Sequence, residues 1–599
     1  MNRVLLSTVH RPLGVETETC TPNVQAEMYH AQVTRAQGIF SIRAECTGWG
    51  LDFIAANLEA PTTVLHYPTH RRFLRELRRG YDYVGIGFVM CTYPKALEMC
   101  RWVREAAPQT KIVLGGYGTV LEECDHFADF VCREEGVGFF KRLLGEEPVE
   151  HFAMPTITRK LKVMSVTTRP EAILPTGLGC SRGCDFCCTS HFFDRRTVPL
   201  LRTGEDIHRA MLAIDLPGSP VRNIGVIDED FLADRRRIEP LIRLNAGVLD
   251  KPILFSCLTS LKSLTQYTTD ELISMGLSGV WVGVESKHAD YPKLKNIDPP
   301  TQIAQLQNAG IATLTSMIIG YDWHDEPTVE EDFQYVLSLK STFSQAMIYS
   351  PCPKTPLYQR FLDEDRLLDV PLKYHDGFHA LFKHPHLSTE RLEQLVLEFF
   401  RREYETLGPS VCRMLDVQLR GFEALRDRED PLSRRRADTC KDLALEIYPL
   451  LKVAIRRAPT ERVRRTLSEM KQRTEDLFAI PARTRVDGRA WSGTSNPSRD
   501  VATCVTSFTS RCGCIAIIRA GYRRFSPTSG ACSTRVAIWR TATVTRRSGW
   551  HGTSTVRRSD GSPASSTDAT TRCAESDLRV SRTSIAPKTS MSPEHCSTG

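Results

Sequence analysis

Three closely spaced cysteines constrain this chain more than any other feature. The stretch Ile173–Phe193 reads ILPTGLGCSRGCDFCCTSHFF, so Cys180, Cys184 and Cys187 follow an apolar run in the spacing C-x3-C-x2-C. Three thiolates on one tight loop can hold three irons of a 4Fe–4S cluster and leave the fourth iron without a protein ligand. A substrate or cofactor can bind at that open iron. The spacing therefore predicts an iron–sulfur loop with these three cysteines as its ligands.

A zinc knuckle is the alternative interpretation of the same cysteines. Structural zinc takes four ligands, usually as two separated pairs. Cys188 offers a fourth thiol, but neighbouring cysteines chelate one ion poorly, and the sequence has no distant C-x2-C pair. The iron–sulfur loop is the better prediction.

Alternating strand and helix patterns predict an α/β fold with two parallel sheets. Over residues 1–150 we expect a Rossmann-like, doubly wound sheet. Its predicted strands are Arg3–Ser7, Thr62–His66, Tyr83–Val89, Lys111–Leu114 and Ala128–Cys132. Such sheets bind ligands at the carboxyl ends of their strands, which places Gly115 and Gly116 where a large planar ligand can approach the backbone.

The pattern restarts over residues 165–365 and predicts a partial (β/α)6 barrel of the TIM type. Its predicted strands are Ala172–Leu178, Asn223–Asp228, Ile253–Cys257, Gly279–Val284, Thr313–Ile319 and Ala346–Ser350. In enzymes with this barrel, the active-site residues lie at the carboxyl ends of the strands. Polar or small residues stand at those ends beside the cysteine loop: Asp228 and Glu229, then Glu285 and Ser286, then Gly320.

The cysteine loop resembles the cluster loop of radical S-adenosylmethionine (SAM) enzymes. In that family the open iron chelates SAM, and one electron cleaves it to methionine and a 5′-deoxyadenosyl radical. The resemblance implies SAM contacts at Phe186, Glu285, Ser286 and Gly320. It places Asp228 and Glu229 near the SAM ammonium or the substrate. The resemblance names no catalytic residue.

The N-terminal half resembles the cobalamin-binding domain that precedes many radical SAM domains. The matching stretches are VLGGYGTV at Val113–Val120 and REEGVGFFKRLL at Arg133–Leu144. They imply cobalamin contacts at Gly115, Gly116 and Tyr117. The Asp-x-His-x-x-Gly signature of proteins that ligate cobalt through histidine is absent, and Thr8-Val9-His10 is the nearest approach. A Rossmann-like domain without a ligand is the alternative.

The C-terminal part divides at about residue 480. Residues 366–480 keep a helical period after a predicted N-cap at Ser388, and four histidines, His375, His379, His384 and His386, precede it. A second metal site there is less favoured than substrate contact or surface packing. Residues 481–599 carry 17 Arg and 1 Lys against 7 acidic residues and no lasting apolar period, typical of a disordered tail or of a gene translated out of frame.

Charge and hydropathy exclude several classes. Residues 1–480 carry 60 basic and 64 acidic side chains, a net charge of −4, so we expect no nucleic-acid-binding surface there. No apolar run reaches the roughly 20 residues of a membrane span. Scattered cysteines and an oxygen-labile cluster favour the cytoplasm.

Together these features predict a radical SAM enzyme, with cobalamin-dependent methylation of a bulky, lipid-like substrate as the leading function. Flavodoxin or ferredoxin is the expected electron donor. Two alternatives stay open: a radical SAM enzyme that works without cobalamin, for example a cyclase, and a non-enzymatic iron–sulfur or zinc sensor.

Overall fold

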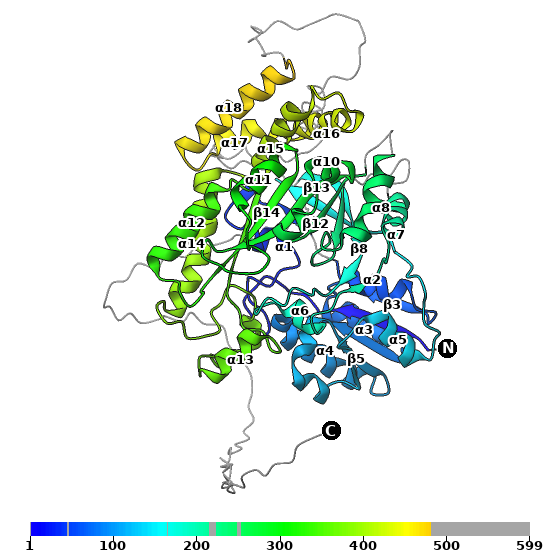
Figure 1. Cartoon of the computed structure of the whole chain (residues 1–599). Coiled ribbons are helices and arrows are strands. Elements are labelled where there is room, and N and C mark those ends of the chain that lie inside the picture. Colours follow the sequence, from blue (N-terminus) through cyan, green and yellow to red (C-terminus); the bar gives the residue numbers. More distant parts are fainter. Residues whose placement is uncertain (1, 45–46, 165, 215–222, 248–252, 481–599) are drawn as a thin grey trace, which may run out of the picture. The chain divides into compact units, whose positions relative to one another are not determined.

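A five-stranded parallel sheet forms the N-terminal layer in a computed structural model of the chain. The structure describes residues 2–44, 47–164, 166–214, 223–247 and 253–480. The strand order is β3-β1-β4-β5-β6. The strands are β1 (Val4–Thr8), β3 (Thr62–Leu65), β4 (Tyr83–Gly87), β5 (Lys111–Gly115) and β6 (Phe130–Val131). The predicted doubly wound sheet is confirmed (Figure 1).

Helices cover both faces of this sheet, as its sequence requires. Leu5 of β1 packs in the core beneath α3 (His70–Leu77) and α4 (Tyr93–Ala106). Its neighbours Val4 and Leu6 face the opposite core, beneath α2 (Trp49–Ala56) and α5 (Gly136–Leu144). Strands buried on both faces read as continuous apolar runs, which is why the sequence located them.

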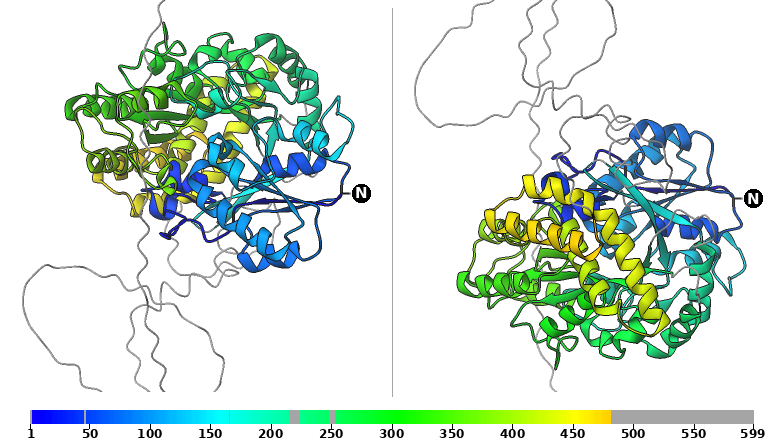
Figure 2. Two further views of the ribbon diagram at one scale, coloured as in Figure 1. Left: turned by 90° about the horizontal axis from the view of Figure 1, so that it is seen from below. Right: turned by 90° about the horizontal axis from the view of Figure 1, so that it is seen from above.

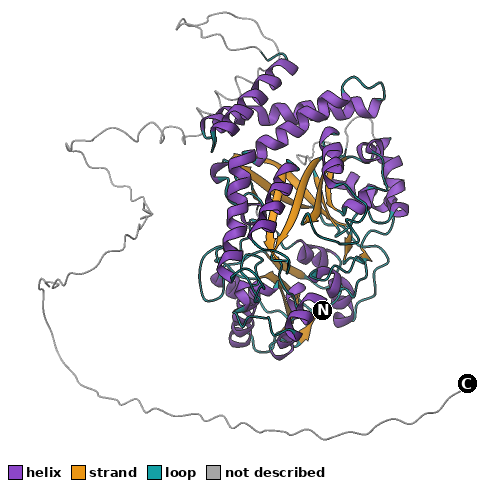
Figure 3. Ribbon diagram, turned by 60° about the vertical axis from the view of Figure 1, so that its left-hand side comes forward, coloured by secondary structure: helices purple, strands orange, loops and turns teal. Residues whose placement is uncertain are grey.

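A second, open sheet holds the six predicted parallel strands in chain order. Its full order is β15-β14-β13-β12-β11-β8-β7-β2. The parallel strands are β8 (Val166–Pro175), β11 (Ile224–Ile227), β12 (Phe255–Leu258), β13 (Leu277–Glu285), β14 (Ala312–Ile319) and β15 (Phe343–Ile348). The helices between them include α7 (Gly204–Ile214), α8 (Arg235–Ala246), α10 (Thr269–Ser274), α11 (Pro299–Asn308) and α12 (Glu326–Ser338). Figure 3 shows these strands with the helices outside them, as expected for a partial barrel.

Two antiparallel strands extend this sheet, and the sequence did not predict them. β7 (Ile157–Val163) pairs with β8, and β2 (Arg43–Ala44) pairs with β7. β2 follows α1 (Met28–Gln32) in a long excursion between β1 and α2. The first 150 residues therefore contribute a strand to the barrel sheet.

A helical layer follows the barrel, as predicted. It contains α13 (Pro356–Asp363), α14 (Thr389–Leu407), α15 (Ser410–Leu425), α16 (Pro431–Ile447), α17 (Leu451–Arg456) and α18 (Glu461–Leu477). Ser388 caps α14 by accepting a hydrogen bond from the Arg391 amide. Figure 2 shows the last of these helices, in yellow, lying against the barrel. None of the described helices is long and apolar enough to cross a membrane. The tail prediction concerns residues 481–599, outside the described part.

Candidate functional site: a cysteine loop facing a cavity

The cysteine loop connects a two-residue strand after β8, β9 (Gly177–Leu178), to a short helix, α6 (Cys188–Phe192). Gly179 (φ +74°) and Gly183 (φ +69°) adopt left-handed backbone angles that favour glycine. The Ser190 hydroxyl donates to the Cys180 carbonyl at 2.6 Å, which ties the loop to α6. The fold therefore holds Cys180, Cys184 and Cys187 on one closed turn at the carboxyl end of β8.

The three thiols lie within electrostatic range of one another. Burial, with a contribution from neighbouring thiols, raises the pKa of Cys180 and of Cys187 to about 11. Burial also raises the pKa of Cys184, against the opposing effect of the Lys293 ammonium. Metal binding must displace these protons. The described residues contain no group of three or more His, Cys, Asp or Glu side chains placed to hold a single metal ion. A 4Fe–4S cluster takes one ligand for each iron, and the three thiols of this loop can supply ligands for three of the four irons.

Three consecutive acids follow β11, and each has different partners. Asp228 accepts from Arg237 at 2.9 Å and from Thr176 at 3.1 Å, so it is committed to a buried ion pair. Asp230 accepts from Arg182 at 2.7 Å, which anchors the cysteine loop.

Glu229 is the acid of this group that retains binding capacity. One carboxylate oxygen accepts from the Tyr117 hydroxyl at 3.1 Å, and the other has no hydrogen-bond partner among the described residues. Burial and the nearby Asp228 charge raise the pKa of Glu229 to about 7. Of the two acids that the resemblance places near SAM, Glu229 is therefore the one available to a ligand.

Glu285 lies at the end of β13 in a left-handed conformation (φ +57°) and pairs with Lys293. The Lys293 ammonium lies 5.8 Å from the centre of the Phe186 ring and 5.7 Å from that of Tyr291. Although burial opposes it, Glu285 raises the pKa of Lys293. The sequence did not single out Lys293, because it lies in a loop with no motif around it.

Aromatic side chains surround Phe186 on the cysteine loop. The rings of Tyr291 and Tyr349 lie 5.7 Å and 5.9 Å from it, and both hydroxyls donate to the Asp185 carboxylate. Phe186, Glu285 and the cysteine loop therefore lie close together around Lys293. Asp185, Tyr291 and Tyr349 were assigned no role from the sequence, although Asp185 lies inside the cysteine motif and Tyr349 in a predicted strand.

Ser286 and Gly320 lie at the predicted strand ends. The Ser286 hydroxyl accepts from the His288 amide at 3.1 Å. The Gly320 amide donates to His324 at 3.0 Å, and a side chain at Gly320 (φ +100°) would meet Leu392 and Phe382 of the helical layer. Any ligand contact of Gly320 would thus come from its backbone.

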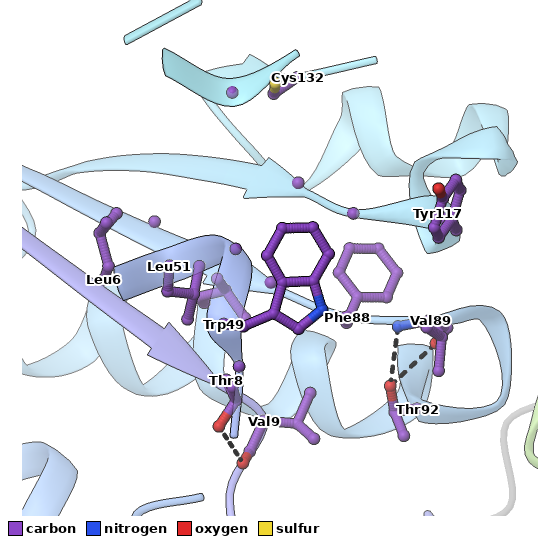
Figure 4. Close-up of a pocket in the computed structure, with 18 of the residues that line it drawn as sticks. Leu6, Thr8, Val9, Trp49, Leu51, Phe88, Val89, Thr92, Tyr117 and Cys132 are labelled. Atoms are coloured by element: carbon purple, nitrogen blue, oxygen red, sulfur yellow. Dashed lines mark hydrogen bonds between the residues drawn. The ribbon is translucent and has the colours of Figure 1, made fainter. Parts of the chain in front are cut away.

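A cavity of about 520 Å³ opens at the carboxyl ends of β1, β4 and β5. Gly115, Gly116 and Tyr117 all line it, and Figure 4 shows the Trp49 indole, at the start of α2, among the lining side chains. None of the described lining residues is a histidine. His10 instead pairs with Glu98 at 2.8 Å.

The two glycines differ in the space beside their Cα atoms. A Cβ at Gly115 would meet only the Cβ of Cys132, at 3.8 Å, so this glycine leaves room for a ligand. A Cβ at Gly116 (φ +90°) would stand 2.5 Å from the Phe88 carbonyl oxygen. Gly116 is therefore required by the backbone turn, whereas Gly115 fits the close approach of a planar ligand.

Tyr117 connects the cavity to the cysteine loop. Its ring lines the cavity and packs edge-on against Phe192 of α6, with ring centres 5.2 Å apart. Its hydroxyl reaches Glu229 beside the loop. Phe192, Phe193 and Leu178 complete the cavity wall on the barrel side.

The histidine-rich stretch contributes an acid to the cavity. Asp376 lines it and accepts from Thr21, Asn23 and His379, at 2.7, 3.0 and 3.0 Å. His375 and His379 lie in a loop after a single 3-10 turn, so the spacing of four residues does not place them on a helix.

Comparison with known proteins gave distant similarities. No family model matches the chain. An uncharacterized methyltransferase, PH0819 from Pyrococcus horikoshii, is 23% identical over 250 residues, which is 40% of this chain and 52% of the relative. The chain thus spans about half the length of that curated relative.

Two similar solved structures are of the radical S-adenosylmethionine methyltransferase TsrM from Kitasatospora setae. One holds tryptophan substrate and a SAM analog; it has a TM-score of 0.48 and 14% identity, over 67% of this chain and 89% of that chain. The other holds cobalamin and a [4Fe-4S] cluster; it has a TM-score of 0.48 and 12% identity, over 76% and 100%. Similarities of this size leave the activity to be argued from the residues of the chain itself.

Proposed function

We propose that the chain is a radical SAM enzyme that uses cobalamin to methylate its substrate. The observation that carries the proposal is the junction at Tyr117, which lines the cavity, packs on α6 of the cysteine loop and donates to Glu229. The methyltransferase name of the Pyrococcus relative supports the transfer of a methyl group. When bound, a 4Fe–4S cluster with SAM would supply a hydrogen-abstracting radical, and cobalamin would supply the methyl group.

The chain offers holding groups for each cofactor. Cys180, Cys184 and Cys187 would each ligate one iron. Around Phe186, the Lys293 ammonium can pair with an anionic group, and the unpaired oxygen of Glu229 can accept from an ammonium or a hydroxyl.

The cavity residues would hold cobalamin and shield the reacting atoms from water. Gly115 leaves room beside the backbone, and Trp49, Phe192 and Phe193 supply apolar walls. Asp376, with Asn23, adds a polar wall from outside the sheet. Apolar surface next to this polar wall supports a bulky substrate, which we propose is lipid-like.

Anaerobic reconstitution with iron, sulfide and cobalamin tests the proposal. We expect about four irons and one cobalamin per chain, 5′-deoxyadenosine from SAM under dithionite, and a methyl group transferred to the substrate. A chain that binds cluster and SAM but no cobalamin would instead be a radical SAM enzyme of another reaction type. Tetrahedral zinc in place of iron would contradict the proposal altogether.

A further inference from the structure

A histidine and an aspartate lie in contact near the ends of two barrel strands, and both are fully buried. His324 belongs to the turn after β14, and Asp332 lies on α12, with 0% of either side chain exposed. The His324 Nε2 and the Asp332 Oδ2 are 3.1 Å apart. Polar groups this deep in a core are costly to bury, so their hydrogen-bond partners indicate what the pair does.

Each member of the pair holds the backbone of a different strand end. The Gly320 amide, directly after β14, donates to the His324 Nδ1 at 3.0 Å. The Lys287 amide, two residues after β13, donates to the Asp332 Oδ1 at 2.7 Å. The pair therefore ties the ends of two neighbouring strands to each other and to α12.

These hydrogen bonds also fix the tautomer of the imidazole. The His324 Nδ1 accepts from an amide, so the single ring proton lies on Nε2 and is donated to Asp332. Asp332 thus accepts at both of its oxygens. An ionised aspartate is an acceptor only and suits both positions, whereas a side-chain amide would present a donor to one of them. The tie between the strands therefore depends on a carboxylate at residue 332.

The backbone held in this way belongs to the site beside the cysteine loop. Glu285 ends β13 with a left-handed φ of +57° and pairs with Lys293. Strained backbone of this kind persists only where its surroundings hold it. The hydrogen bond to Asp332 holds the chain two residues beyond Glu285, and Gly320 is the other strand end that the resemblance assigns to SAM.

We propose that His324 and Asp332 are positioning residues, which set the SAM affinity of the site by holding the ends of β13 and β14 at a fixed spacing. The inference rests on the proposed function, in which SAM binds beside Phe186 and these strand ends. Neither side chain touches SAM, because both are enclosed by the core. They act through the backbone: strand ends that are already ordered lose less of the binding energy when SAM arrives.

Asp332→Asn in the reconstituted holoenzyme tests the proposal, because it keeps the shape of the side chain and removes one acceptor. We expect the dissociation constant for SAM, measured by anaerobic equilibrium dialysis, to rise about tenfold, which is the loss of one hydrogen bond. The KM for SAM in dithionite-driven cleavage should rise with it. Iron content and the rate at saturating SAM should stay within about threefold of wild type, whereas a general folding defect would lower both.

Amide hydrogen exchange measures the same tie without SAM. Peptides that contain Gly320 and Lys287 should exchange faster in Asp332→Asn than in wild type. His324→Gln repeats the test if Asp332→Asn does not fold. A glutamine amide can still donate to Asp332, but the Gly320 amide loses its acceptor. In that variant the exchange should rise at the Gly320 peptide alone, and the affinity for SAM should fall.

Glu403→Gln is the matched control, because it also changes a buried acid to its amide. Glu403 lies on α14, is 1% exposed and pairs with Arg413 at 2.8 Å. This variant should lower the melting temperature and leave the SAM dissociation constant within about twofold of wild type.

The outcomes separate the positioning role from the proposed function. Equal SAM affinity in Asp332→Asn and wild type would overturn the positioning role, as would an equal loss in Glu403→Gln or unchanged exchange at both strand ends. Wild type that holds four irons but binds no SAM would count against the proposed function instead, and the exchange measurement would still show whether the pair holds the strand ends.

Discussion

At the residue scale, partners decide what neighbouring side chains of one type can do. Asp228, Glu229 and Asp230 follow the same strand, yet the outer two are held in ion pairs with Arg237 and Arg182. Glu229 is half-buried, accepts from the Tyr117 hydroxyl, and has no ion pair among the described residues. Burial without a cation penalises the charged form of a carboxyl group. Glu229 is thus able to hold a proton near neutral pH, beside the loop and the cavity.

The difference in stability between Glu229→Gln and the wild type should change with pH, because only the wild type carries a titrating carboxyl group at this position. The pKa of Glu229 is raised from 4.5 to about 7 in the folded chain. The wild type therefore loses stability as pH rises from 4.5 through 7, because the folded carboxyl group resists ionisation. Between pH 5.5 and pH 8, the free energy of unfolding of Glu229→Gln should improve by about 2 kcal/mol relative to wild type. Urea unfolding of the apo protein at both pH values measures this, and a constant difference would contradict it.

The cysteines Cys184 and Cys188 should also differ in function, because they have different partners. Cys184→Ala should abolish the charge-transfer absorbance and iron content of the reconstituted protein, because it removes one thiolate of three. Cys188→Ala should keep both, since the Cys188 thiol is directed to Cys352 and packs with the core of the first sheet. Loss of iron in both variants would mean that Cys188 is a ligand.

At the element scale, β5 ends at Gly115 and is followed by Gly116, and these two glycines permit a discriminating pair of substitutions. Gly115→Leu adds a side chain in open space, so it should fill the cavity without bending the backbone. We expect cobalamin affinity to fall about tenfold or more while the iron content and dithionite-driven SAM cleavage persist. Equilibrium dialysis with hydroxocobalamin measures the affinity, and unchanged binding would place cobalamin elsewhere.

Gly116→Ala serves as the control for that experiment. Its Cβ would collide with the Phe88 carbonyl at a φ of +90°. The expected cost is about 2 kcal/mol of folding stability, seen as a lower melting temperature. Because the side chain does not enter the cavity, any loss of cobalamin in Gly116→Ala should track the loss of folded protein.

Local patterns predicted the elements whose signal lies in adjacent residues. The six barrel strands and five Rossmann strands are short apolar runs, and each was located to within a few residues, although β8 begins six residues before its predicted start. β7 was missed because ITRKLKV interleaves charged residues, and β2 because two residues form no pattern. Their pairing joins segments more than one hundred residues apart, and local periodicity carries no such information.

The site residues also divide into those that local motifs predicted and those that only the folded chain shows. Cys180, Cys184, Cys187 and Glu285 follow strands in recognisable stretches, and the structure gathers them. Lys293 reaches the same place from a loop with no motif, and Tyr349 comes from the end of a predicted strand to which no role was assigned. Local sequence patterns could not predict the ion pair of Asp228 with Arg237 or the close approach of the Phe88 carbonyl to Gly116. Both depend on how separate segments of the chain pack together.

At the scale of the whole molecule, every residue assigned to a cofactor lies upstream of α18. The helical layer is completed by Phe478, whose ring packs edge-on against Phe422 at 5.0 Å, with the Lys441 ammonium 6.0 Å above it. The Ile480 amide still donates to the Glu475 carbonyl, at 2.9 Å. A packed end of this kind marks where a shortened chain can stop.

A chain ending at Ile480 should therefore keep iron content, cobalamin binding and SAM cleavage within about twofold of the full chain. The removed segment has 18 basic and 7 acidic residues and no periodic apolar face, so its sequence offers little that could dock on the body. Its arginines should instead attract anionic polymers, so the shortened chain should bind RNA more weakly at low salt, as measured by a gel-shift titration.

A further cut before Phe478 tests the boundary, because it removes an aromatic ring from the core of the helical layer and should lower the melting temperature. If the chain ending at Ile480 loses its cofactors, residues 481–599 support the site, and the interpretation of that segment as a disordered or out-of-frame tail is wrong.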